Sequence, residues 1–99
     1  MNIAFLIGSP LISGGSYVIF EHALRLAEYG NNVTIIMEQA LSEGKEELKW
    51  HQKAQTLKWT TYSEIEEQRI FFDMVLATWW KTVYELHRVK SKRYAYFVQ

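Results

Sequence analysis

The most constraining feature of this sequence is its first 36 residues, in which two apolar strands enclose a helix. Residues 2–7 form an unbroken apolar run, which is typical of a strand that is covered on both faces of a sheet. Residues 8–15 are rich in glycine and serine, which permit tight turns. Apolar side chains then recur at helical spacing over residues 18–27, Gly30 provides a C-cap, and residues 33–36 restart a strand. This order predicts a β-α-β unit.

The glycine-rich loop of this unit comes directly before the predicted helix. Backbone N–H groups and the helix dipole favour anions at such a position. Gly14 and Gly15 allow the backbone to approach a ligand closely, and Ser13 and Ser16 add hydroxyl donors. The loop has neither the Gly-Lys-Ser/Thr of a P-loop nor the spacing of a dinucleotide-binding loop. It therefore predicts a site for a phosphate or sugar group, with a simple tight turn as the structural alternative.

Strands and helices continue to alternate along the rest of the chain. We expect five strands, at residues 2–7, 33–37, 55–60, 73–78 and 94–98. Ser63 and Glu66 match a capping box for a short helix at 64–69, and helical spacing predicts a second helix over 80–90. A loop with a short helix is expected at 42–53. The alternation predicts an α/β fold with a Rossmann-like parallel sheet of about five strands and flanking helices.

Length and composition restrict the class of protein. The 99 residues are enough for one compact domain over residues 1–99, and 48% of them are hydrophobic. Because there is no cysteine, a disulfide framework and a thiolate metal site are excluded. No apolar run approaches the roughly 20 residues of a transmembrane helix, and the first residues lack the pattern of a signal peptide. We therefore expect a cytoplasmic protein.

Charge is balanced over the whole chain but unevenly distributed. Residues 1–50 carry three basic and six acidic groups, whereas residues 51–99 carry eight basic and five acidic groups. The stretch from Arg88 to Arg93 holds four basic residues and no acid. Four charges are too few for a nucleic-acid-binding face, so no nucleic-acid partner is expected. A solvated helix end is the simple interpretation of this stretch, and peripheral contact with a membrane or an acidic partner is the functional alternative.

Two stretches of the sequence resemble family-4 glycosyltransferases of the GT-B type. Residues 3–36 read IAFLIGSPLISGGSYVIFEHALRLAEYGNNVTII, and their Gly-Gly loop, His-Ala helix and V-T-I-I strand are similar to the opening of that family. Residues 72–86, FDMVLATWWKTVYEL, with residues 93–99, RYAYFVQ, look like the fourth strand, the following helix and the fifth strand of rhamnosyl- and related cell-surface-polysaccharide transferases. The resemblance covers most of the chain outside residues 39–68.

The resemblance implies a glycosyltransferase, which transfers a sugar from a nucleotide-sugar to a saccharide or a lipid-linked acceptor. Enzymes of this family have two Rossmann-like domains, and the chain resembles part of the first, acceptor-side domain. The acidic motif and the donor pocket of the second domain have no counterpart here. We therefore expect an incomplete GT-B N-terminal domain that is inactive without a donor-binding domain. No metal and no cofactor are implied, because cationic side chains and helix dipoles neutralise the leaving group in this family.

Further candidate residues follow the fourth predicted strand. Thr78, Trp79 and Lys81 fall at or just beyond its carboxyl end, where ligands bind in open α/β sheets. The Trp79 indole can stack on a sugar ring, and Lys81 can reach a phosphate. His22 is expected on the packed side of the first helix, as a structural residue. The predicted substrate-binding residues are Ser13, Gly14, Gly15, Ser16, Trp79 and Lys81, and no catalytic residue is assigned.

Two alternatives stand beside the glycosyltransferase domain. One is a non-catalytic acceptor-side or docking subunit of a split glycosyltransferase, which the basic stretch and an open sheet edge would suit. The other is a free-standing flavodoxin-like module, although the acidic pair and the aspartate of a receiver domain are missing. An unpaired apolar edge at residues 94–98 also predicts a dimer or an aggregate unless a partner, such as a C-terminal domain, covers it.

Overall fold

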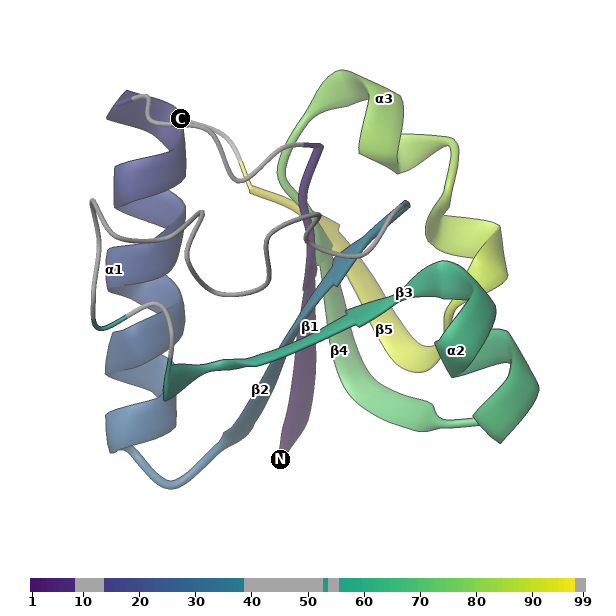
Figure 1. Ribbon diagram of the computed structural model, residues 1–99, viewed down its shortest axis with the longest axis horizontal. Coiled ribbons are helices and arrows are strands. Elements are labelled where there is room, and N and C mark those ends of the chain that lie inside the picture. The colour runs from purple at the N-terminus through teal and green to yellow at the C-terminus, as the bar shows by residue number, and fades with distance from the viewer. Residues whose placement is uncertain (9–13, 39–52, 54–55, 98–99) are drawn as a thin grey trace.

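A parallel sheet with helices on both faces forms the described part of the chain, which is residues 1–8, 14–38, 53 and 56–97 of a computed structural model (Figure 1). In chain order, the elements are β1 (Asn2–Leu6), α1 (Gly14–Glu28), β2 (Asn32–Met37), β3 (Lys58–Thr61), α2 (Tyr62–Gln68), β4 (Phe71–Ala77), α3 (Trp80–Val83), the 3-10 helix η3 (Leu86–Arg88) and β5 (Lys90–Tyr96). The strands lie in the order β3-β2-β1-β4-β5, and every neighbouring pair is parallel. The predicted Rossmann-like α/β class is confirmed.

The central strands divide the core into two layers, because successive side chains point to opposite faces. One layer packs against α1 and includes Ile3, Phe5, Ile7, Ile35 and Phe20. The other packs against α2 and the end of η3 and includes Ala4, Leu6, Ile36, Ile65 and Val89. Figure 1 shows α1 on one side of the sheet and α2, α3 and η3 on the other. Both faces are covered, which explains the unbroken apolar runs of β1 and β2.

The carboxyl end of α1 has the C-cap that the sequence predicts. Gly30 adopts a φ of 92°, a conformation that favours glycine. Its N–H group donates to the carbonyl oxygen of Ala27 at 3.0 Å, and the Asn31 N–H group donates to that of Leu26 at 3.3 Å. This pair of hydrogen bonds is a Schellman motif, which ends α1 and turns the chain toward β2.

Helix α2 begins earlier than the capping box at Ser63 predicts. Thr61 is the N-cap, and its hydroxyl oxygen accepts a hydrogen bond from the Glu64 N–H group at 3.3 Å. Thr61 is still extended as the last residue of β3, so the strand passes directly into the helix. The sequence contains this second Thr-x-x-Glu pattern two residues before the one at Ser63, and strand pairing selects it. Strand β3 likewise begins at Lys58 and not at residue 55.

The predicted helix over residues 80–90 is wrong in its second half. Helix α3 ends at Val83, η3 follows, and Lys90 already pairs with Phe71 in the sheet. Val89 is fully buried in the core layer beneath α2 and its backbone is extended, with φ −121° and ψ 119°, so the helical stretch ends before it. The simple interpretation of the basic stretch as a helix end is therefore also wrong, because Lys90, Lys92 and Arg93 lie on β5.

Two remaining expectations concern other parts of the chain. The loop predicted at residues 42–53 lies outside the described residues, except for its last position. Among the described helices, none has the length and apolar character needed to cross a membrane.

Candidate functional site

The topology defines a switch point at the carboxyl ends of β1 and β4, which are neighbours in the sheet. After β1 the chain turns to α1 on one face, and after β4 it turns to α3 and η3 on the opposite face (Figure 1). Ligands of open α/β sheets bind in the crevice that such divergence creates. The residues that follow Leu6 and Ala77 are therefore the first candidates for a ligand site.

An indole ring lies against the glycine that follows β1. A Cβ atom on Gly8 would lie 2.6 Å from Cε3 and 2.9 Å from Cζ3 of Trp79, so the ring occupies the space of the missing side chain. Trp79 nevertheless remains 43% exposed. The Trp79 indole thus lies against Gly8, just beyond the end of β1, and is partly open to solvent at the switch point. Sequence analysis treats Gly8 only as a turn residue, because a contact with residue 79 leaves no local signal.

Hydrogen bonds with Thr82 hold the main chain of Trp79 in place. The Thr82 hydroxyl accepts from the Trp79 N–H group at 3.1 Å and donates to the Trp79 carbonyl oxygen at 2.6 Å. The Thr82 N–H group donates to the same carbonyl oxygen at 2.9 Å. One residue earlier, the buried Thr78 hydroxyl donates to the Leu6 carbonyl oxygen at 2.7 Å and joins the ends of β4 and β1. Thr82 stands three residues after Trp79, which is the spacing of a helix N-cap and its N3 residue. This spacing was the sequence signal that could have predicted the capping contact of Thr82.

Two of the predicted binding residues are brought together at this point. The ammonium group of Lys81 lies 5.0 Å from the centre of the Trp79 ring, within the range of a cation–π contact. An aromatic plane beside an ammonium group can stack on the apolar face of a sugar and neutralise a phosphate attached to it. The arrangement thus suits a sugar phosphate better than a neutral apolar ligand.

The predicted glycine loop is only partly within the described residues. Ser13 lies outside them, whereas Gly14, Gly15 and Ser16 are the first three residues of α1. The first turn of α1 contains no acidic residue, so no carboxylate of that turn opposes an anion. The start of α1 and α3 lie at the same edge of the sheet (Figure 1). This edge therefore carries all of the described residues that the sequence assigns to binding.

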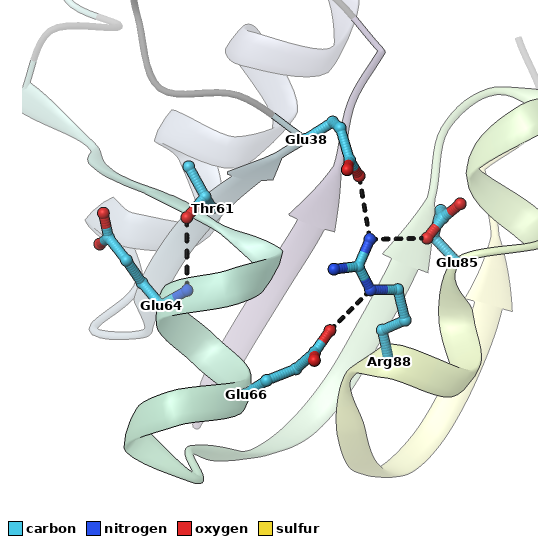
Figure 2. Close-up of polar contacts among 6 residues, drawn as sticks. All are labelled: Glu38, Thr61, Glu64, Glu66, Glu85 and Arg88. Atoms are coloured by element: carbon cyan, nitrogen blue, oxygen red, sulfur yellow. Dashed lines mark hydrogen bonds and ion pairs between the residues drawn. The ribbon is translucent and has the colours of Figure 1, made fainter.

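Arg88 organises a second polar cluster, which sequence reasoning missed (Figure 2). Its Nε atom donates to Glu66 at 2.6 Å, and its Nη1 atom donates to Glu38 at 2.9 Å and to Glu85 at 3.2 Å. The three carboxylates come from the end of β2, from α2 and from the turn before η3. Two of them are 22 and 50 residues away from Arg88 in the sequence, so no spacing pattern announces the cluster. We call these four residues the Arg88 clasp.

The Arg88 clasp covers a buried tyrosine. The guanidinium lies 4.8 Å from the centre of the Tyr62 ring, and Tyr62 is only 2% exposed. The Tyr62 hydroxyl has no hydrogen-bond partner among the described residues. Burial raises the pKa of Tyr62 well above its ordinary range, and the charges of Glu85 and Glu38 raise it further. The hydrogen bond with Glu66 raises the pKa of Arg88, so the clasp holds a permanent cation above a neutral phenol.

The remaining candidate of the first helix, His22, is exposed and does not lie on the packed side. Its ring contacts Phe97 edge to face, with centroids 5.0 Å apart at 65°. This contact agrees with a packing role. The predicted place on the packed side of the helix is wrong, because His22 is exposed and contacts Phe97, which directly follows β5. Within the described residues, no three His, Asp or Glu side chains gather in a way that could hold a metal ion.

No family model, curated protein or solved structure matches this chain. The geometry of the carboxyl edge and the sequence resemblance are therefore the two grounds on which a function is proposed.

Proposed function

We propose that the chain is the acceptor-side, N-terminal domain of a glycosyltransferase, which transfers a sugar from a nucleotide-sugar to a saccharide or a lipid-linked acceptor. The observation that carries this proposal is the position of Trp79, which lies on Gly8 at the switch point with the Lys81 ammonium above its ring. The sequence resemblance over residues 3–36 and 72–86 supports the class of reaction.

Each proposed binding residue has a distinct task. Trp79 stacks on a sugar ring of the acceptor, and Lys81 neutralises a phosphate of the acceptor or the donor. The N–H groups at Gly14 and Gly15 orient the same phosphate at the start of α1. The hydroxyls of Ser13 and Ser16 donate hydrogen bonds to ligand oxygens. The nucleotide-sugar is bound mainly by a second domain, which also supplies the cations that stabilise the leaving group.

NMR titration of the folded chain with glucose 1-phosphate and with UDP-glucose tests this proposal. We expect saturable shifts at the Gly14 and Gly15 amides and at the Trp79 indole. Trp79→Ala and Lys81→Gln should each weaken glucose 1-phosphate binding by about fivefold, which is the effect of roughly 1 kcal/mol. The matched control is Lys58→Gln, which removes the same charge at the start of β3, at the opposite edge of the sheet. Undiminished binding by both site variants would contradict the proposal.

One observation favours the docking subunit as a second candidate. Strand β5 pairs only with β4 among the described strands, and five of its seven residues are exposed: Lys90, Lys92, Arg93, Tyr94 and Tyr96. Such an edge can accept a strand from a partner protein. A folded chain whose Trp79 indole responds to neither sugar ligand would favour the docking subunit over the acceptor-binding domain.

A further inference from the structure

A second cleft lies away from the switch point, at the amino ends of β4 and β5. It has a volume of about 550 Å³ and lies between α2 and η3. Its lining residues are Ile65, Glu66, Arg69, Ile70, His87, Arg88 and Lys90. The volume is within the range of small-molecule sites, which is about 300–1,000 Å³. We call it the basic cleft.

The charges of the basic cleft do not cancel. Glu66 is the one acidic residue among the described lining residues, and its carboxylate is bound by Arg88 within the Arg88 clasp. Arg69 and Lys90 are both exposed, and neither makes an ion pair with any residue that the structure describes. His87, also exposed, adds an imidazole to the lining. Among its described lining residues, the cleft therefore offers two cationic side chains and an imidazole to a ligand, and Glu38 and Glu85 of the Arg88 clasp are not part of this lining.

Two of the lining residues of the basic cleft, Ile65 and Ile70, are apolar, and we call them its floor. Ile65 is 3% exposed and belongs to the core layer beneath α2, and Ile70 packs against the same layer. A ligand that fits both the cations and the floor has an anionic end and an apolar body. Inorganic phosphate alone would leave the floor unused.

The backbone of Arg69 is a second indication that its side chain has a task. Arg69 has a φ of 55°, a left-handed conformation in which glycine costs least. Its N–H group caps α2 by donating to the Ile65 carbonyl oxygen, a task that any residue type with an N–H group can perform. Arg69 thus brings a long cationic side chain to the lining of the cleft at a position where the left-handed backbone favours glycine, which has no side chain. Such outliers are concentrated at functional sites.

We propose that the basic cleft binds a small phosphate monoester with an apolar substituent. Arg69 and Lys90 hold the phosphate with charge-assisted hydrogen bonds, His87 adds a further contact, and the substituent lies on the partly exposed Ile70. This site is independent of the proposed glycosyltransferase site, because it lies at the opposite edge of the sheet and shares no residue with it.

Titration of the 99-residue chain with phenyl phosphate, followed by NMR, tests the proposal. We expect saturable shifts at Arg69, His87 and Lys90, and binding about tenfold tighter than that of inorganic phosphate. Lys90→Gln and Arg69→Gly should each weaken phenyl phosphate binding by about tenfold. Arg93→Gln is the matched control, because it removes one exposed charge from the same strand on the opposite face. Trp79→Ala should leave this binding unchanged, which separates it from the glycosyltransferase proposal.

Arg69→Gly also separates binding from folding. Because glycine relieves the left-handed backbone, this variant should unfold at the same or a higher temperature than the wild type while it loses affinity. A variant that loses stability but keeps its affinity would show that Arg69 serves only the end of α2, and would overturn the proposal. Absence of saturable shifts in the basic cleft of the wild-type chain would overturn it as well.

Discussion

At the scale of single residues, the place of Trp79 depends on the absence of a side chain at Gly8. Replacing Gly8 by Ala introduces a Cβ atom 2.6 Å from the indole, so the ring must move. We expect Gly8→Ala to shift the Trp79 indole resonance, to weaken sugar phosphate binding and to cost about 1 kcal/mol of unfolding free energy. In a Trp79→Ala background the same substitution should be close to neutral. Equal costs in both backgrounds, measured by urea unfolding, would contradict a direct contact.

Tyr62 is buried, but burial of its polar hydroxyl group is unfavourable. Tyr62→Phe removes a buried hydroxyl that has no partner among the described residues. We expect the variant to be about 1 kcal/mol more stable than the wild type at pH 7. Urea unfolding of both proteins, with Tyr29→Phe as the exposed control, measures this difference. A less stable Tyr62→Phe variant would indicate that the hydroxyl has a hydrogen bond in solution.

We expect the ionisation of Tyr62 to make the free energy of unfolding depend on alkaline pH. Burial, followed by the charges of Glu85 and Glu38, raises the pKa of Tyr62 in the folded state. In the unfolded state tyrosine ionises near pH 10. Below pH 10 the phenol is neutral in both states, so the folded state keeps its full stability. As pH rises above 10, the unfolded state releases the Tyr62 proton while the folded state retains it, and the free energy of unfolding falls until pH reaches the folded-state pKa. Between pH 10 and 11.5 the wild type should therefore lose stability more steeply than Tyr62→Phe.

At the scale of elements, the Arg88 clasp joins the end of β2, helix α2 and the turn before η3. Arg88→Met keeps much of the aliphatic stem but leaves three carboxylates close together. The Arg88 side chain is 24% exposed, so solvent screens part of this effect. We expect a loss of about 1–3 kcal/mol in unfolding free energy.

The control for the Arg88 clasp is Lys92→Met on β5. Lys92 lies 3.8 Å from Asp73, and its side chain is 69% exposed, so the pair should contribute less than about 0.5 kcal/mol. Arg88→Lys should recover only part of the loss, because one ammonium group cannot reproduce the planar donors that reach Glu66 and Glu38. Equal urea midpoints for Arg88→Met and Lys92→Met would show that the clasp adds little.

At the scale of the whole molecule, β5 pairs only with β4 among the described strands, and we expect this edge to govern association. Exposed Tyr94 and Tyr96 favour pairing with another strand, whereas like charges at Lys90, Lys92 and Arg93 oppose pairing with a second copy. We expect dimers or larger species in light scattering at high protein concentration, in greater proportion at 0.5 M salt than at low salt. Tyr96→Lys should reduce this association, and Tyr29→Lys, which lies at the end of α1, should not. A monodisperse monomer at high protein concentration and 0.5 M salt would contradict the prediction.

The sequence by itself determined the features that depend on near neighbours. The unbroken apolar runs of β1 and β2 predict buried parallel strands, and Gly30 marks the end of α1 because the left-handed turn favours glycine. Alternation of strands and helices gives the α/β class. Trp79 could be assigned to the carboxyl edge of the sheet because it follows an apolar run that ends a strand. Each of these inferences uses a pattern that spans only a few residues.

Only the tertiary structure decided the features that depend on strand order. The pairing of Phe71 with Lys90 ends the helical stretch after Val83, although the apolar spacing continues. Gly8 meets Trp79, and Arg88 meets Glu38, because β1, β2 and β4 are neighbours in the sheet. The basic cleft likewise arises where α2 and η3 pack on the same face. Such contacts join segments tens of residues apart, and the free energy that selects them comes from burial in the assembled core, which no local pattern records.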